Sequence, residues 1–187
     1  MKSLLTYFVA LLYSLPTGNK ATPDSLHQAV ALSFQSPVDI PIQLAGTYGE
    51  PRKLHFHTGI DIRTNQMEGL NIYAVEQGYV SRINVSGSGY GKALYITHPR
   101  GYTSVYAHLL CFSEKIERRL RQEQYAKESF SVDFSLKPHE LPVAKGELVA
   151  LSGNTGGSGG PHLHFEIRDS LERPINPMKF GFIAPDT

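Results

Sequence analysis

Two histidines two residues apart are the first feature of this sequence that could carry chemistry. They are His162 and His164, in the stretch GGPHLHFEIR at residues 159–168. In a β-strand, side chains two apart point to the same face, so both imidazoles would address one point, together with Glu166. The apolar residues between and after them would face the core. The stretch therefore predicts a half-buried strand with a polar, imidazole-bearing face.

A second polar group lies in HFHTGID, residues 55–61, where His57 precedes Asp61 by four positions. With His164 these residues would supply two nitrogens and one carboxylate oxygen. Three protein ligands leave a fourth tetrahedral position open for water, which distinguishes a catalytic zinc from a structural one. This ligand set suits zinc but does not exclude other divalent metals. His55 would share the face of His57 in an extended stretch, and the spacing to the aspartate favours His57.

A third candidate is His108 in the stretch VYAHL, residues 105–109. Strand alternation would turn Tyr106 and His108 to one face and the apolar residues of the stretch inward. A histidine beside a metal-bound water can take its proton, and it can also bind a developing oxyanion. The sequence thus predicts non-ligand histidines that assist hydrolysis.

In this order the three stretches resemble the M23 family of zinc metallopeptidases, the LytM or lysostaphin type that cuts peptidoglycan cross-bridges. The motifs are HTGID at 57–61, YAHL at 106–109 and GNTGGSGGPHLHFE at 153–166. The resemblance covers roughly residues 45–180. It implies antiparallel β-sheets that form a groove around the metal.

The resemblance also implies a role for each matching residue. His57, Asp61 and His164 match the family's zinc ligands, for one ion per chain, and His108 and His162 match its two catalytic histidines. In the implied mechanism a zinc-bound water attacks the scissile carbonyl, one histidine acts as base, and the other stabilises the oxyanion. The sequence does not assign which does which. The implied substrates are the stem peptides and cross-bridges of peptidoglycan.

The elements that must position these residues are short strands. Turn signals every eight to twelve residues predict a mainly β, antiparallel fold. The expected strands lie at residues 71–75, 78–85, 93–98, 102–109 and 162–168, and residues 142–151 are expected to contain a Lys-Gly turn and a strand. Pro99-Arg100-Gly101 predicts a hairpin between two of them, and GSGYG at 87–91 predicts a turn.

The segment 113–141 breaks the strand pattern. Its first half is charged and has a helical period, with Ile116, Leu120 and Tyr125 on one face. It predicts one exposed helix, inserted between the second and third motifs. We interpret this segment as a solvated spacer, and the alternatives are a wall of the cleft or a surface that binds a regulatory protein.

The N-terminus predicts export. Lys2 precedes an apolar run of about a dozen residues, too short to span a bilayer comfortably, which is typical of a signal peptide. Residues 1–22 would be this signal peptide or an uncleaved membrane anchor, and the chain would be periplasmic or extracellular. The other expected divisions are a lead-in segment, the metallopeptidase domain and a C-terminal tail, at residues 23–44, 45–180 and 181–187.

Composition narrows the function further. The chain has 187 residues, room for one ordinary domain, and a net charge of +1 gives no basic face for nucleic acid. The single cysteine, Cys111, excludes an intrachain disulfide and a cysteine-based zinc site, and it is predicted to be a small core residue. The sequence does not set an oligomeric state.

Two other functions are considered beside the endopeptidase. One is a catalytically silent or gated module that regulates other cell-wall hydrolases, and the other is a binding domain with a structural metal. The intact ligand set and both further histidines favour the enzyme. Glu166 is interpreted either as a hydrogen-bond partner behind a ligand or as part of a surface salt bridge. Arg52 is interpreted as scaffold or substrate contact, and His98 as structural or exposed.

Overall fold

The computed structural model describes residues 34–53 and 55–182, which form a mainly β fold with antiparallel sheets and one α-helix. The predicted fold class is therefore confirmed. The predicted signal peptide or anchor and the first half of the lead-in segment, residues 1–33, lie outside the described residues. Within the described part, no helix is long and apolar enough to cross a membrane.

Short strands occupy most of the chain. In order they are β1 (Leu44–Gly46), β2 (Ile60–Arg63), β3 (Asn71–Tyr73), β4 (Gly78–Val85), β5 (Lys92–Thr97), β6 (Thr103–Ala107), β7 (Cys111–Phe112), β8 (Val132–Ser135), β9 (Pro142–Val143), β10 (Leu148–Leu151), β11 (His162–Arg168) and β12 (Pro174–Ile175). The helix α1 spans Glu114–Ala126, and short 3-10 turns lie at Pro99–Gly101 and Pro177–Phe180. The first of these turns joins β5 to β6, as the hairpin signal predicts.

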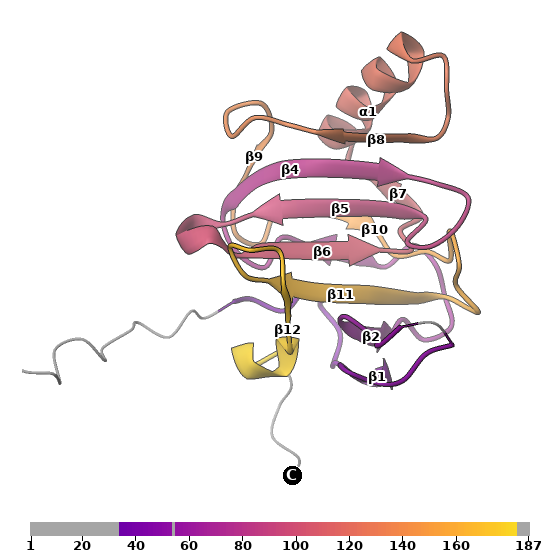
Figure 1. The fold of residues 1–187 in the computed structure, drawn as a ribbon, viewed down its shortest axis with the longest axis vertical. Helices are drawn as coiled ribbons and strands as arrows, with labels where there is room; N and C mark the ends of the chain where they lie inside the picture. The colour runs from indigo at the N-terminus through magenta and orange to yellow at the C-terminus, as the bar shows by residue number, and fades with distance from the viewer. Residues whose placement is uncertain (1–33, 54, 183–187) are drawn as a thin grey trace, which may run out of the picture. The chain divides into compact units, whose positions relative to one another are not determined.

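The large sheet brings distant parts of the sequence together. Its strand order is β1-β2-β11-β6-β5-β4-β8, with β12 beside β11 and β9 beside β4 (Figure 1). A small second sheet has the order β3-β10-β7. In the large sheet His164 lies opposite Asp61 on one side and Ala107 on the other. Residues facing each other across antiparallel strands share a face, so β2 and β11 present Asp61 and His164 to one region, beside Ala107 of β6.

The alternation predicted for the last strand is confirmed. Leu163, Phe165 and Ile167 are fully buried in the main hydrophobic core. Residues on the opposite face of β11 are then free to serve the site. Packing of the apolar face fixes the register, because a slip by one residue would exchange the two faces.

The prediction that Tyr106 shares a face with His108 is wrong. Tyr106 lies in the main core, where its hydroxyl accepts a hydrogen bond from the Val75 amide at 3.0 Å. Val105 and Ala107 instead lie on the face that carries His164. His108 follows the strand with a φ of +59°, in the left-handed region. This backbone turn breaks the strand alternation.

Replacing Tyr106 with phenylalanine should lower the free energy of unfolding by about 1–3 kcal/mol, because the buried Val75 amide loses its acceptor. Urea denaturation would measure the change. Tyr125→Phe is the matched control, since that side chain is 80% exposed and its hydroxyl should contribute little. Equal effects of the two substitutions would contradict the interpretation.

The segment 113–141 contains more than the predicted helix. α1 buries Ile116 and Leu120, whereas Tyr125 is exposed. The prediction that Tyr125 belongs to the apolar face of the helix is therefore wrong. Residues after the helix form β8, which pairs with β4 and which we did not predict. Figure 1 shows α1 beside β8, at the far end of the strand order from β1 and β2.

The prediction that Cys111 is a core residue is wrong. Cys111 lies in β7, at the edge of the small sheet, and is only partly buried.

Candidate metal centre

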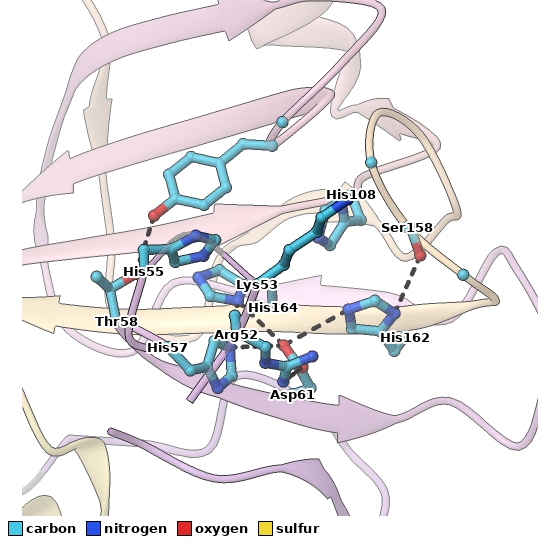
Figure 2. Close-up of a pocket in the computed structure, with 14 residues that line it drawn as sticks. Arg52, Lys53, His55, His57, Thr58, Asp61, His108, Ser158, His162 and His164 are labelled. Carbon is cyan, nitrogen blue, oxygen red and sulfur yellow. Dashed lines mark hydrogen bonds and ion pairs between the residues drawn. The ribbon is translucent and has the colours of Figure 1, made fainter. Parts of the chain in front are cut away.

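A cleft of about 410 Å³ opens beside β2 and β11. Its lining includes every candidate site residue of the sequence analysis: His57, Asp61, His108, His162 and His164 (Figure 2). None of the described lining residues comes from the segment 113–141, so that segment is not a wall of the cleft. Its interpretation as a surface for a regulatory protein stays a prediction.

Three donor atoms converge at the base of this cleft. His57 Nε2 lies 2.9 Å from His164 Nδ1, and Asp61 Oδ1 lies 3.0 Å from each of these nitrogens. All three side chains are buried. Asp61 and His164 are held by adjacent strands, and His57 just before β2 is fixed by its amide, which donates to the Glu50 carbonyl.

The outer nitrogens of the two imidazoles set their tautomers. His57 Nδ1 lies 2.8 Å from the Thr47 carbonyl, and His164 Nε2 lies 2.9 Å from a carboxylate oxygen of Glu166. Because only an N–H can bond to these acceptors, the nitrogens that face each other carry lone pairs. Two lone pairs and a carboxylate oxygen this close form a set of donor atoms suited to a cation.

The donor set is compatible with zinc. Zinc bonds of about 2.0–2.1 Å in a tetrahedron separate ligand atoms by about 3.3 Å, close to the separations found here. Imidazole and carboxylate are ordinary zinc ligands, and hydrogen bonds behind the imidazoles are the usual support of such sites. His55 is exposed and lies outside this group of three.

Asp61 is kept ionised by its surroundings. Burial would raise the pKa of this carboxyl group, but the close contacts with the side chains of His162, His164 and His57 hold it well below its usual value. The Arg52 guanidinium also donates to Asp61 Oδ2 at 2.8 Å. This contact supports the scaffold interpretation of Arg52, which also lines the cleft.

Glu166 lies at the centre of a buried network. Its side chain is inaccessible to solvent, and it accepts hydrogen bonds from His164, Thr58 and Tyr90 and a charged bond from Arg168 at 2.8 Å. Burial would raise the pKa of Glu166, but the bond to His164 and the nearby positive charges lower it. Its position behind a candidate ligand is thus the correct interpretation, and the surface interpretation is wrong.

Tyr90 and Thr58 are site residues that the sequence analysis missed. The Tyr90 ring stacks on His164 with centroids 5.1 Å apart, and its hydroxyl lies 3.0 Å from that of Thr58. The available signal was an aromatic residue between glycines in the GSGYG turn. His98, by contrast, is buried away from the cleft and bonds to the Gln77 carbonyl, so its role is structural.

His108 and His162 flank the donor group. Their ring centroids lie 4.7 Å apart. His108 Nδ1 donates to the Thr155 carbonyl and His162 Nδ1 to the Gly160 carbonyl, each at 2.8 Å. Nε2 of each ring is therefore left for contacts within the cleft, and Figure 2 shows His162 directed toward Asp61, whose Oδ1 lies 3.5 Å from His162 Nε2.

The two rings differ in their readiness to take a proton. Burial lowers the pKa of His108 to about 4, so it is neutral near pH 7. Burial would also lower the pKa of His162, but its bonds to Asp61 and the Gly160 carbonyl raise it instead. The pair thus combines one neutral imidazole with one that is protonated more easily.

The glycine loop before β11 allows this arrangement. Gly156 has a φ of +74°, and a Cβ there would lie 2.3 Å from the Gly91 amide nitrogen. The loop can therefore rest directly on the turn that carries Tyr90. A side chain at this position would push the two apart.

Comparisons with known proteins place this sequence among peptidases. The family model of Peptidase family M23 matches residues 55–139 and 125–177. The DD-carboxypeptidase/endopeptidase Mpg of Neisseria meningitidis is 32% identical over 130 residues, which are 70% of this chain and 24% of that protein. The peptidoglycan DD-endopeptidase ShyA of Vibrio cholerae is 30% identical over 165 residues, which are 83% of this chain and 31% of that protein.

A solved structure shows the same fold. A zinc-containing peptidase from Vibrio cholerae superposes with a TM-score of 0.57 at 25% identity, over 76% of this chain and 38% of that one. The chain spans only 24–31% of the length of these curated relatives. The match of the family model, which extends over more than half of the sequence, nevertheless settles the family. The chain belongs to peptidase family M23.

Proposed function

We propose that the protein is a zinc-dependent endopeptidase that hydrolyses peptide cross-links of bacterial peptidoglycan. One observation carries the proposal: three acceptor atoms lie within 3.0 Å of one another in a cleft that also contains two further histidines. The names of the relatives, a DD-carboxypeptidase/endopeptidase and a peptidoglycan DD-endopeptidase, support the substrate. The expected place of action is outside the cytoplasm, in the periplasm or the extracellular space.

Each residue has a defined part in this proposal. His57, Asp61 and His164 would hold one zinc ion through Nε2, Oδ1 and Nδ1. When bound, zinc polarises the scissile carbonyl and lowers the pKa of water, which supplies the nucleophile. His108 and His162 use Nε2, one to take a proton and the other to donate a hydrogen bond to the developing oxyanion.

Release of muropeptides tests the proposal. The protein is incubated with zinc and purified peptidoglycan, and the soluble products are identified by mass spectrometry. Conversion of cross-linked dimers to monomers is expected, and the new termini would identify the bond. A folded, zinc-loaded protein that releases nothing would contradict the enzyme and favour a gated or silent module.

Glu166→Gln is expected to weaken zinc binding about 10- to 100-fold, because the neutral amide supports the His164 tautomer less well than the carboxylate does. Competition with a chromophoric chelator would measure the affinity without any assay of hydrolysis. Glu68→Gln is the control, since Glu68 is exposed and does not line the cleft. Unchanged affinity in Glu166→Gln would show that the buried network does not support the metal.

A further inference from the structure

The two walls of the cleft differ in charge. Arg52, Lys53 and His55 line one wall, and a neutral loop that includes Gly157 and Gly159 lines the other. Apart from the histidines, the formal charges among the described lining residues are those of Arg52, Lys53 and Asp61. The balance in the cleft therefore depends on how these three are paired.

Two of the three charges already have partners. Arg52 contacts Asp61 Oδ2 at 2.8 Å and Glu50 Oε2 at 3.4 Å. Asp61 also belongs to the donor group, so zinc would neutralise it further. Neither residue leaves a free charge for a substrate.

Lys53 remains without a partner among the described residues. It is exposed and forms no hydrogen bond or ion pair with any of them, although it lines the cleft (Figure 2). Its ammonium group is a flexible point charge on a long stem. With zinc bound the cleft has a net positive charge, and a cleft with one sign of charge attracts ligands of the other.

The neutral wall leaves room for a peptide beside this charge. A Cβ built on Gly159 would meet no atom within 4 Å, and no positive φ demands glycine there. Packing within the protein thus does not explain the missing side chain. An extended substrate chain could lie against this wall with its side groups toward Lys53.

We propose that Lys53 determines specificity by binding a free carboxylate of the substrate close to the scissile bond. This inference rests on the proposed function and narrows its substrate class. Cross-links formed through a diamino diacid carry such a carboxylate beside the bond that is cut, whereas a bridge of neutral residues carries none. The cleft accordingly selects acidic cross-links over neutral ones.

The test compares two synthetic cross-linked peptides. One bears the free carboxylate beside the scissile bond, and in the other this group is a primary amide. The wild-type protein should have a kcat/KM about 5- to 10-fold higher for the acid. Lys53→Gln should bring the ratio below about 2, and Lys53→Glu should reverse it, while the exposed Lys137→Gln should keep the wild-type ratio.

Ionic strength gives an independent readout. The preference should shrink between 50 and 500 mM salt because added ions screen an exposed charge pair. If Lys53 had only a structural role, Lys53→Gln would change neither the preference for the acid nor the salt dependence of this preference. A wild-type protein that cuts both peptides equally would overturn the inference and leave the proposed function intact.

If neither peptide is cut, a measurement of peptide binding still tests the role of Lys53. Calorimetric titration of the zinc-loaded His162→Ala variant with each peptide measures recognition without hydrolysis. Tighter binding of the acid, lost in the double variant with Lys53→Gln, supports the inference even if the proposed function fails. Equal binding of the two peptides overturns it.

Discussion

Replacing His164 with alanine is expected to abolish stoichiometric zinc binding and to lower kcat/KM on cross-linked peptidoglycan at least about 10³-fold. His164 supplies one of the three converging donor atoms, 3.0 Å from Asp61 Oδ1. Polarisation by a metal ion contributes several kcal/mol to such a reaction, and each 1.4 kcal/mol is about a factor of ten. Zinc content by atomic emission and release of monomeric muropeptides are the two readouts.

His55→Ala is the matched control for this experiment. His55 lines the same cleft two residues before a candidate ligand, yet it lies outside the group of three donor residues. Its replacement should leave zinc content unchanged. A His164→Ala variant that still binds one zinc ion tightly would contradict the assigned ligand set, and equal losses in both variants would indicate general damage to the cleft.

Replacing His162 with alanine should lower kcat without any loss of zinc. Zinc content should stay at one ion per chain, because His162 Nε2 lies 3.5 Å from Asp61 Oδ1 and belongs to no donor pair of the centre. The value of kcat should fall about 10²- to 10⁴-fold, the range expected when a general acid or base is removed. Parallel measurement of zinc and kcat separates a catalytic role from a ligand role.

The neighbour of His162 offers a control for geometry. Ser158 Oγ lies 3.2 Å from His162 Nδ1, but the Gly160 carbonyl already accepts from this nitrogen at 2.8 Å. Ser158→Ala should therefore lower kcat only slightly. If Ser158→Ala reduced kcat as much as His162→Ala, the effect of the histidine would lie in the shape of the loop rather than in proton transfer.

Local patterns predicted the strand that carries the site. On β11 the two-residue period of apolar and polar side chains is regular, and Leu163 and Phe165 are buried as expected. Three motifs in a fixed order then predicted which polar residues meet. Their convergence depends on pairing between β2 and β11, which no single stretch of sequence encodes.

The errors arise where the backbone departs from its period. His108 has a φ of +59°, so alternation from Tyr106 fails at this residue. The strand β8 was missed for another reason. Its buried residues Val132 and Phe134 alternate with exposed ones, but they follow a charged helical stretch, and the sequence of the whole segment therefore predicts an insertion.

Tyr90 shows a different limit. Its ring contacts His164, so the 87–91 turn meets the strand β11, which lies far away in the chain. The two-residue period of a strand does not predict such a contact. The glycine loop packs against the 87–91 turn, and the hydrogen bonds of the Tyr90 hydroxyl with Thr58 and Glu166 hold the ring at the site. Sequence patterns find ligands more readily than the groups that orient them.

The distance in sequence between the candidate ligands has a consequence for folding. His57 and His164 are 107 residues apart, so an ion bound to both closes a loop that contains most of the domain. Closing a long loop in an unfolded chain is entropically costly, and the ion therefore binds almost only to the folded state. At a concentration 100 times its Kd, such a ligand adds about 2.7 kcal/mol to stability. A bound ion would therefore stabilise the fold across this long loop, and removal of metal should lower the free energy of unfolding as well as any activity that depends on the ion.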